Sequence, residues 1–274
     1  MRPAPALGRL LLIGSLLGSP SVVGAAPPAP DRWCAPELGV LPTDVCYALP
    51  ADETATASEL IVFLHGVIAP NGTWQWAQQR AAARAAATHG VAALMPKGRR
   101  GLRDDHMKDW YTWPTGVAAR RRAESAVLEE WWAAKRALER KLGRPFDRVY
   151  VFGFSNGAYY VSSLALRGRL DIDGYASFAG GTAGPRIAPR AFADVRRVPW
   201  YVGYGQRDTP AVQGASRLRR AFKALRWPGK VVGRPRVGHT MTDSQVREAL
   251  EFLRQQHRAR PAPEGQAGGS STSR

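Results

Sequence analysis

The feature that most constrains the fold is the alternation of short apolar runs with helix-forming stretches from residue 59 onward. Unbroken apolar runs are typical of strands buried on both faces, and helices between them permit parallel pairing. The predicted strands cover residues 59–66, 91–96, 148–154, 173–180, 198–205 and 230–235. The predicted helices cover residues 76–88, 116–142, 211–225 and 243–257, with another starting near Asn156. We therefore expect an α/β fold with a mostly parallel sheet, helices on both faces, and ligands at the carboxyl ends of the strands.

Both ends of the chain differ in composition from this central region. Residues 1–25 carry Arg2 and Arg9, then the apolar run Leu10–Leu17, then small residues, which is the order of a secretory signal peptide. The apolar run is too short for a membrane span, which needs roughly 20 residues, so no stable membrane anchor is expected. Residues 258–274 are rich in Pro, Gly and Ser, which predicts a disordered tail. The predicted layout is a signal peptide, one domain over residues 26–257, and the tail, in a secreted or periplasmic protein.

The chain has two cysteines, Cys34 and Cys46. In an exported protein, a close isolated pair favours a disulfide over a metal site or a catalytic thiol. Two thiols without partnering histidines supply too few ligands for zinc. We predict a disulfide, no metal and no cofactor.

The formal charge of the chain is +17. Such a surface associates with polyanions at low salt. The arginines are scattered, and no nucleic-acid-binding motif accompanies them. The simpler interpretation is a solvated basic surface without a specific nucleic-acid partner, and the sequence leaves the oligomeric state undetermined.

A Gly-x-Ser-x-Gly motif at residues 153–157 joins a predicted strand directly to a predicted helix. This is the setting in which a serine lies on a strained turn with its hydroxyl above the sheet, and glycines are needed where a Cβ would crowd the turn. The alternative is a serine that only caps the helix. We predict that Ser155 is a nucleophile.

A serine nucleophile needs a base and an acid, which follow it in the order acid then histidine. His239 lies in the loop after the last predicted strand, whereas His257 lies at the end of the last helix. Asp208 follows a strand at the carboxyl edge of the sheet, where it can orient the imidazole. The other acidic candidates that we considered after Ser155 either precede strands or lie in the last helix: Asp171, Asp173, Asp194, Asp243, Glu248 and Glu251. Asp243 is explained as a helix cap. The predicted triad is Ser155, Asp208 and His239.

An oxyanion hole requires two N–H donors beside the nucleophile. The backbone of Asn156, directly after Ser155, is one candidate, and the backbone of Val67 in the loop after the first core strand is the other. His65 precedes this loop. His65 is either catalytic or, as we expect, buried at the strand end, where it supports the loop.

The segment between the second predicted strand and the long helix is the least regular part of the core and leaves the sheet at its carboxyl edge. Its side chains Trp110, Tyr111 and Trp113 either form an apolar wall for the substrate or pack the loop down. Its acidic and histidine residues are interpreted as solvated partners of arginines rather than metal ligands: Asp104, Asp105, His106 and Asp109.

Four motifs in order, LHG, GFSNG, GQRD and GHT, resemble the α/β-hydrolase superfamily over residues 60–253. Within it, the chain is similar to secreted poly(3-hydroxybutyrate) depolymerase-like and feruloyl-esterase-like esterases, and to the small carboxylesterase/phospholipase group. The sequence departs from many relatives at GQRDTP. In those relatives a valine-containing run closely follows the acidic residue. The resemblance implies metal-free hydrolysis of a small-molecule or polymeric ester through an acyl-enzyme. A serine peptidase or acyltransferase with the same triad, or a non-catalytic binding protein on this scaffold, are the alternatives.

Overall fold

The computed structural model describes residues 32–51, 57–182 and 195–259. The predicted signal peptide and residues 260–274 of the predicted tail lie outside them, as does Asp194. One eight-stranded sheet has the order β1-β2-β4-β3-β5-β6-β7-β8. Its strands are β1 (Gly39–Val40), β2 (Cys46–Ala48), β3 (Glu59–Leu64), β4 (Ala92–Met95), β5 (Arg148–Phe154), β6 (Gly174–Phe178), β7 (Trp200–Gly205) and β8 (Gly229–Arg234). The six strands from β4 to β8 pair in parallel.

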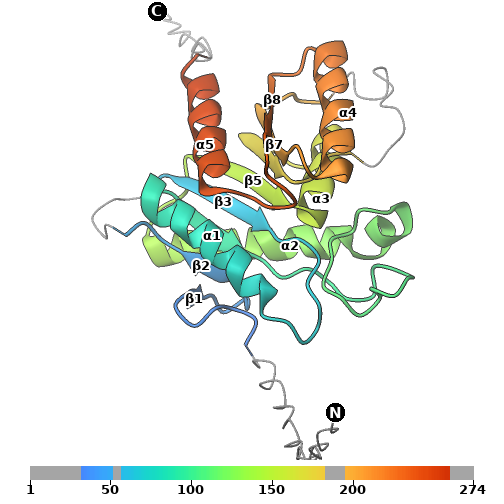
Figure 1. The fold of residues 1–274 in the computed structure, drawn as a ribbon. Helices are drawn as coiled ribbons and strands as arrows, with labels where there is room; N and C mark the ends of the chain where they lie inside the picture. Colours follow the sequence, from blue (N-terminus) through green and yellow to red (C-terminus); the bar gives the residue numbers. More distant parts are fainter. Residues whose placement is uncertain (1–31, 52–56, 183–194, 260–274) are drawn as a thin grey trace, which may run out of the picture.

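Helices cover both faces of the sheet (Figure 1). They are α1 (Trp74–His89), α2 (Val117–Leu142), α3 (Asn156–Leu166), α4 (Thr209–Leu225) and α5 (Asp243–Arg258). Residues of α2, α3 and α4 pack into one hydrophobic core, and residues of α1 and α5 pack into the other. The predicted mostly parallel sheet with helices on both faces is confirmed.

Several helix ends carry a left-handed or a capping residue. Gly90 and Gly143 close α1 and α2 in the left-handed conformation that glycine adopts without strain. Thr242 caps α5 in a capping box with Gln245. Asp243, predicted to be that cap, is instead the first helical residue and forms an ion pair with Arg84. Thr242 is the better cap because its hydroxyl reaches the Gln245 N–H at 3.3 Å.

The two N-terminal strands were not predicted from the sequence. They add antiparallel to the edge of the sheet, where Cys46 of β2 pairs with Met95 of β4. A Cys34–Cys46 disulfide, with a Cα–Cα distance of 5.5 Å, ties the chain before β1 to this edge. The predicted disulfide is therefore present in the structure.

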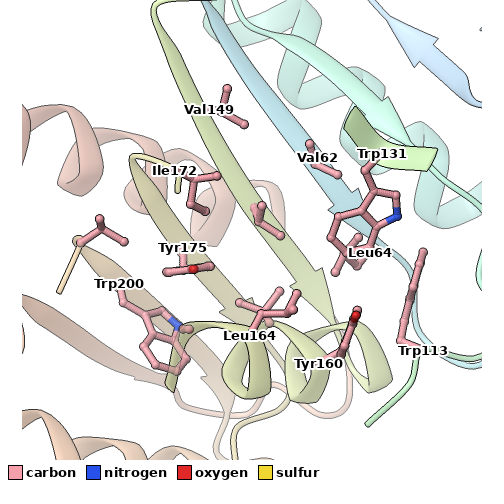
Figure 2. Close-up of a cluster of buried hydrophobic side chains, with 14 of the residues drawn as sticks. Val62, Leu64, Trp113, Trp131, Val149, Tyr160, Leu164, Ile172, Tyr175 and Trp200 are labelled. Atoms are coloured by element: carbon pink, nitrogen blue, oxygen red, sulfur yellow. The ribbon is translucent and has the colours of Figure 1, made fainter. Parts of the chain in front are cut away.

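Figure 2 shows the core on the α2–α3 face, where large aromatic side chains fill the space beneath the helices. Trp113 packs against Trp131 and Tyr160, with ring-centroid distances of 5.6 and 6.2 Å. Burial of such side chains contributes about 25 cal/mol for each Å² of apolar surface removed from water. This packing holds the carboxyl ends of β3 and β5 against the helices.

Candidate active site

Ser155 occupies a strained turn between β5 and α3. Its φ of 53° and ψ of −116° lie in a region that non-glycine residues rarely adopt. The flanking glycines are required by close backbone contacts. A Cβ at Gly153 would lie 2.5 Å from the backbone of Gly157, and a Cβ at Gly157 would lie 2.2 Å from the carbonyl oxygen of Leu64. The turn leaves the Ser155 side chain partly exposed at the carboxyl edge of the sheet.

The three residues predicted as a triad are joined by two hydrogen bonds. His239 Nε2 lies 2.8 Å from Ser155 Oγ, and His239 Nδ1 lies 2.6 Å from Asp208 Oδ2. The Asp208 side chain is 4% exposed, whereas that of His239 is 52% exposed. The imidazole is therefore held on one side by a buried carboxylate and is open to solvent on the other. This geometry suits proton transfer from the serine to the histidine.

The loops after β7 and β8 hold this pair together. Asp208 is the N-cap of α4, and its Oδ1 accepts the Ala211 N–H at 3.3 Å. The Arg207 N–H donates to the carbonyl oxygen of Val237 in the His239 loop at 2.9 Å. A Cβ at Gly205 would lie 2.3 Å from that same oxygen. The absence of a side chain at Gly205 therefore allows the two loops to meet.

The loop after β3 lies against the serine turn. The Gly157 N–H donates to the carbonyl oxygen of His65 at 3.1 Å, and a Cβ at Gly66 would lie 3.1 Å from Ser155 Cβ. The backbone N–H groups of Asn156 and Val67 have no hydrogen-bond acceptor within the described part of the chain. Both are thus free to donate to an oxyanion at Ser155.

His65 is fully buried and neutral. Its Nε2 accepts the Gly98 N–H at 2.9 Å, so the proton is on Nδ1, which donates to the carbonyl oxygen of Gly66. Burial is the main cause that lowers the pKa of His65 to about 4. The His65 side chain thus connects the loop after β3 with the loop after β4. This is the structural role that the sequence predicted for it.

The three predicted wall residues differ in burial. Trp113 is 1% exposed and packs in the core, where its Nε1 donates to the carbonyl oxygen of His65 at 2.8 Å. The prediction that Trp113 lines the substrate site is corrected, because its buried ring exposes no face to a ligand. Tyr111 pairs through its backbone with Ile68 of the β3 loop, and Trp110 is partly buried.

Gln78 directly contacts the loop after β3 and is not among the residues predicted from the sequence. Its Oε1 accepts the Gly66 N–H at 2.7 Å, and the side chain is 5% exposed. Gln75, Gln78 and Gln79 all lie on the buried face of α1. Three glutamines spaced three and four residues apart in an alanine-rich helix indicate that one face of the helix makes buried polar contacts.

The comparisons with known proteins give the family. A family model described as Phospholipase/Carboxylesterase matches residues 51–257. The chain belongs to this family. Of the groups that the sequence resembled, the match selects the carboxylesterase/phospholipase group. No curated protein sequence matches the chain.

Solved structures share the fold of this family member. Esterase PE8 is 18% identical, with 76% of this chain and 96% of that chain covered and a TM-score of 0.54. TT1662 from Thermus thermophilus is 21% identical, with 82% and 98% covered and a TM-score of 0.52. A carboxylesterase from Mesorhizobium loti is 18% identical, with 77% and 93% covered and a TM-score of 0.52. These similarities confirm the α/β-hydrolase fold.

In this phospholipase/carboxylesterase family member, carboxylates of the loop at residues 104–109 pair with arginines. Asp105 and Asp109 form ion pairs with Arg103 and Arg100. The Arg103 guanidinium holds the pKa of the Asp105 carboxyl well below its usual range. No helix among the described residues is long and apolar enough to cross a membrane.

Proposed function

We propose that this chain is an exported serine esterase that hydrolyses carboxylic esters through an acyl-enzyme. The observation that carries the proposal is the hydrogen-bonded chain from Ser155 through His239 to Asp208. The family described as Phospholipase/Carboxylesterase supports ester hydrolysis. Residues 1–25 and the Cys34–Cys46 disulfide support export.

The reaction begins when Ser155 Oγ attacks the ester carbonyl carbon. His239 Nε2 takes the hydroxyl proton, and Asp208 orients the ring and stabilises its charged form. The backbone N–H groups of Asn156 and Val67 donate to the oxygen of the tetrahedral intermediate. Collapse of the intermediate breaks the bond to the alcohol oxygen, which receives the proton from His239. An acyl group then remains on Ser155.

Deacylation repeats these steps with water in place of the serine hydroxyl. The imidazole of His239 removes a proton from water, the resulting hydroxide attacks the acyl carbon, and Ser155 leaves as the protonated alcohol. The products are a carboxylic acid and the free enzyme. No metal or redox cofactor takes part in this scheme.

The proposal is tested with a fluorophosphonate probe and p-nitrophenyl butyrate. Wild-type protein should be labelled on Ser155 and cleave the ester, and Ser155→Ala should lose labelling and lower kcat by about 10³-fold or more. Circular dichroism should show that the variant is folded. An unchanged hydrolysis rate after this substitution would contradict the proposed nucleophile.

The same panel distinguishes the esterase from a peptidase. Peptide amides should be cleaved slowly or not at all, because the amide leaving group needs its own binding site, and the described residues form one sheet with its covering helices. A higher kcat/KM for peptide amides than for esters would replace the esterase proposal by a peptidase with the same triad. Absence of labelling on Ser155 would favour a binding protein.

A further inference from the structure

One segment of the chain is basic without any acidic residue. Residues 209–242 form α4, β8 and the loop that carries His239, and they contain no Asp or Glu. Their eight basic residues are Arg217, Arg219, Arg220, Lys223, Arg226, Lys230, Arg234 and Arg236. Arg234 pairs with Glu248, and the other seven have no carboxylate partner among the described residues. The surface they form therefore carries uncompensated charge.

The charges on α4 repel one another. Arg219 and Lys223 are four residues apart, and Arg220 and Lys223 are three apart, which are the spacings at which side chains of a helix are neighbours. Like charges at these spacings destabilise a helix. By contrast, α2 and α5 each contain a cation paired with a carboxylate four residues on, at Lys135–Glu139 and Arg247–Glu251. The charge pattern of α4 costs stability, and a bound anion would relieve this cost.

The basic side chains lie on a segment of the chain that begins beside the triad. The seventeen residues of α4 span about 25 Å. The helix follows its N-cap Asp208 and ends at the opposite edge of the sheet, where Arg226 and Lys230 are exposed. At the triad end, Arg207 precedes Asp208, and Arg236 lies in the loop that carries His239. Arg207 and the seven basic residues without a carboxylate partner make a set of eight that we call the α4 strip: Arg207, Arg217, Arg219, Arg220, Lys223, Arg226, Lys230 and Arg236.

The α4 strip offers charge but no apolar anchor. The large hydrophobic side chains that are exposed among the described residues, Val40, Trp74 and Val117, belong to other segments. Phe222 and Trp227, the aromatic residues between Arg217 and Arg236, are buried. Bases of single-stranded nucleic acid would find no ring to stack on, and a bilayer would find no side chain to insert. The partner that fits is hydrophilic, linear and anionic.

We propose that the α4 strip binds a linear acidic polysaccharide whose pendant carboxylic esters reach Ser155. This inference rests on the proposed esterase function, because it requires the partner to carry both negative charge and the ester that is cleaved. Nucleic acids carry no carboxylic ester in their backbone. An acidic polysaccharide supplies carboxylates along its length and acyl groups on its hydroxyls. Binding along α4 raises the local concentration of esters at the triad.

The test uses the full chain and compares esters on charged and neutral polymers. Arg220→Glu with Lys223→Glu reverses two exposed cations whose side chains make no hydrogen bond among the described residues. Arg121→Glu with Arg140→Glu makes the same charge change on exposed positions of α2 and is the matched control. Each protein is assayed on acetylated polygalacturonate, acetylated dextran and p-nitrophenyl acetate, at low and at high salt.

At low salt, the α4 double variant should lose about tenfold or more in kcat/KM on acetylated polygalacturonate, through a higher KM. Its rates on acetylated dextran and p-nitrophenyl acetate should equal those of wild type. The α2 control should retain the wild-type rate on all three substrates. High salt should remove the difference between wild type and the α4 variant, because added ions screen exposed charges.

Three results would overturn the proposal. The first is an α4 variant that keeps its rate on the acidic polymer, or loses it equally on the neutral one. The second is a wild-type protein that cleaves p-nitrophenyl acetate but not the acidic polymer. The third is an unchanged rate on the polymer while binding of double-stranded DNA or phosphatidylglycerol vesicles falls, which would assign the strip to that partner. Failure of wild type on p-nitrophenyl acetate would instead reject the esterase function itself.

Discussion

Asp208 combines two hydrogen-bonding roles in one buried carboxylate. One oxygen accepts the Ala211 N–H at the start of α4, and the other lies 2.6 Å from His239 Nδ1. Asparagine caps helices about as well as aspartate, but it lacks the charge that stabilises a protonated imidazole. A single substitution can therefore separate the structural role from the chemical one.

Asp208→Asn should lower kcat on p-nitrophenyl butyrate by about 10⁴-fold, because the amide favours the wrong histidine tautomer. Thermal unfolding should be nearly unchanged, since the cap is retained. Asp171→Asn is the matched control: the Asp171 side chain is 90% exposed and pairs with Arg196 away from the triad. A variant that keeps its activity would remove Asp208 from the triad.

Gln78 acts on the site through the β3 loop. Gln78→Met removes the acceptor for the Gly66 N–H and leaves that donor buried, at a cost of about 1–3 kcal/mol in the free energy of unfolding. The neighbouring Val67 N–H then loses its fixed orientation, so kcat should fall about tenfold with little change in KM.

Gln75→Met is the control for Gln78. It replaces another buried amide one turn earlier in α1, which makes no hydrogen bond to Gly66 in the structure. Kinetics and thermal unfolding are measured on both variants. Equal kcat losses in both would mean that Gln78 only stabilises α1 and does not position the loop.

At the scale of secondary structure, the positions of the three residues of the proposed triad could be predicted because each follows a recognisable strand. Long apolar runs identify β5 and β7, and the residue after each strand must lie at the carboxyl edge of a parallel sheet. β1 and β2 have two and three residues, too few to show a periodic pattern. Their pairing depends on contacts with β4 that are distant in sequence.

The orientation of side chains in irregular segments could not be predicted either. Trp110, Tyr111 and Trp113 belong to no long helix or strand, so no period separates the inward from the outward positions. The structure buries Trp113 because its indole N–H finds the His65 carbonyl oxygen and its ring finds Trp131. Both partners are distant in sequence.

The N-terminal element is fixed to the sheet by the Cys34–Cys46 disulfide. A sequence separation of 12 residues corresponds to about 3 kcal/mol of loop-closure entropy in the simple chain model. Cys34→Ser with Cys46→Ser should therefore lower the free energy of unfolding by about 3 kcal/mol, as measured by denaturant titration.

The same element also contacts the site. The Trp33 ring lies 5.3 Å from the His65 ring and 4.8 Å from the Tyr111 ring.

Reduction of the disulfide is the control for the double cysteine variant. Reduction of wild-type protein by dithiothreitol should reproduce the stability loss of the double variant. The variant itself should show no further change when reductant is added. An unchanged stability in the double variant would show that other contacts hold this element in place.

At the scale of the whole molecule, buried His65 links stability to pH. Its pKa in the folded protein is about 4, below the ordinary value of 6.5. Above pH 6.5 the ring is neutral in both states. As the pH falls from 6.5 toward 4, the unfolded chain binds a proton that the folded protein does not, so the free energy of unfolding falls. Below about pH 4 the folded protein is protonated too, and the loss levels off.

Denaturant titrations from about pH 7.5 to 4.5 should therefore show a loss of roughly 2–3 kcal/mol due to His65. His65→Gln provides the comparison, because its amide offers an acceptor for the Gly98 N–H and a donor for the Gly66 carbonyl oxygen but does not titrate. Burial also lowers the pKa of His89, which adds a loss of the same sign to both proteins and cancels in their difference. Parallel pH profiles for the two proteins would mean that the folded protein accommodates a charged His65. The loop beside Ser155 would then tolerate protonation that its buried hydrogen bonds should forbid.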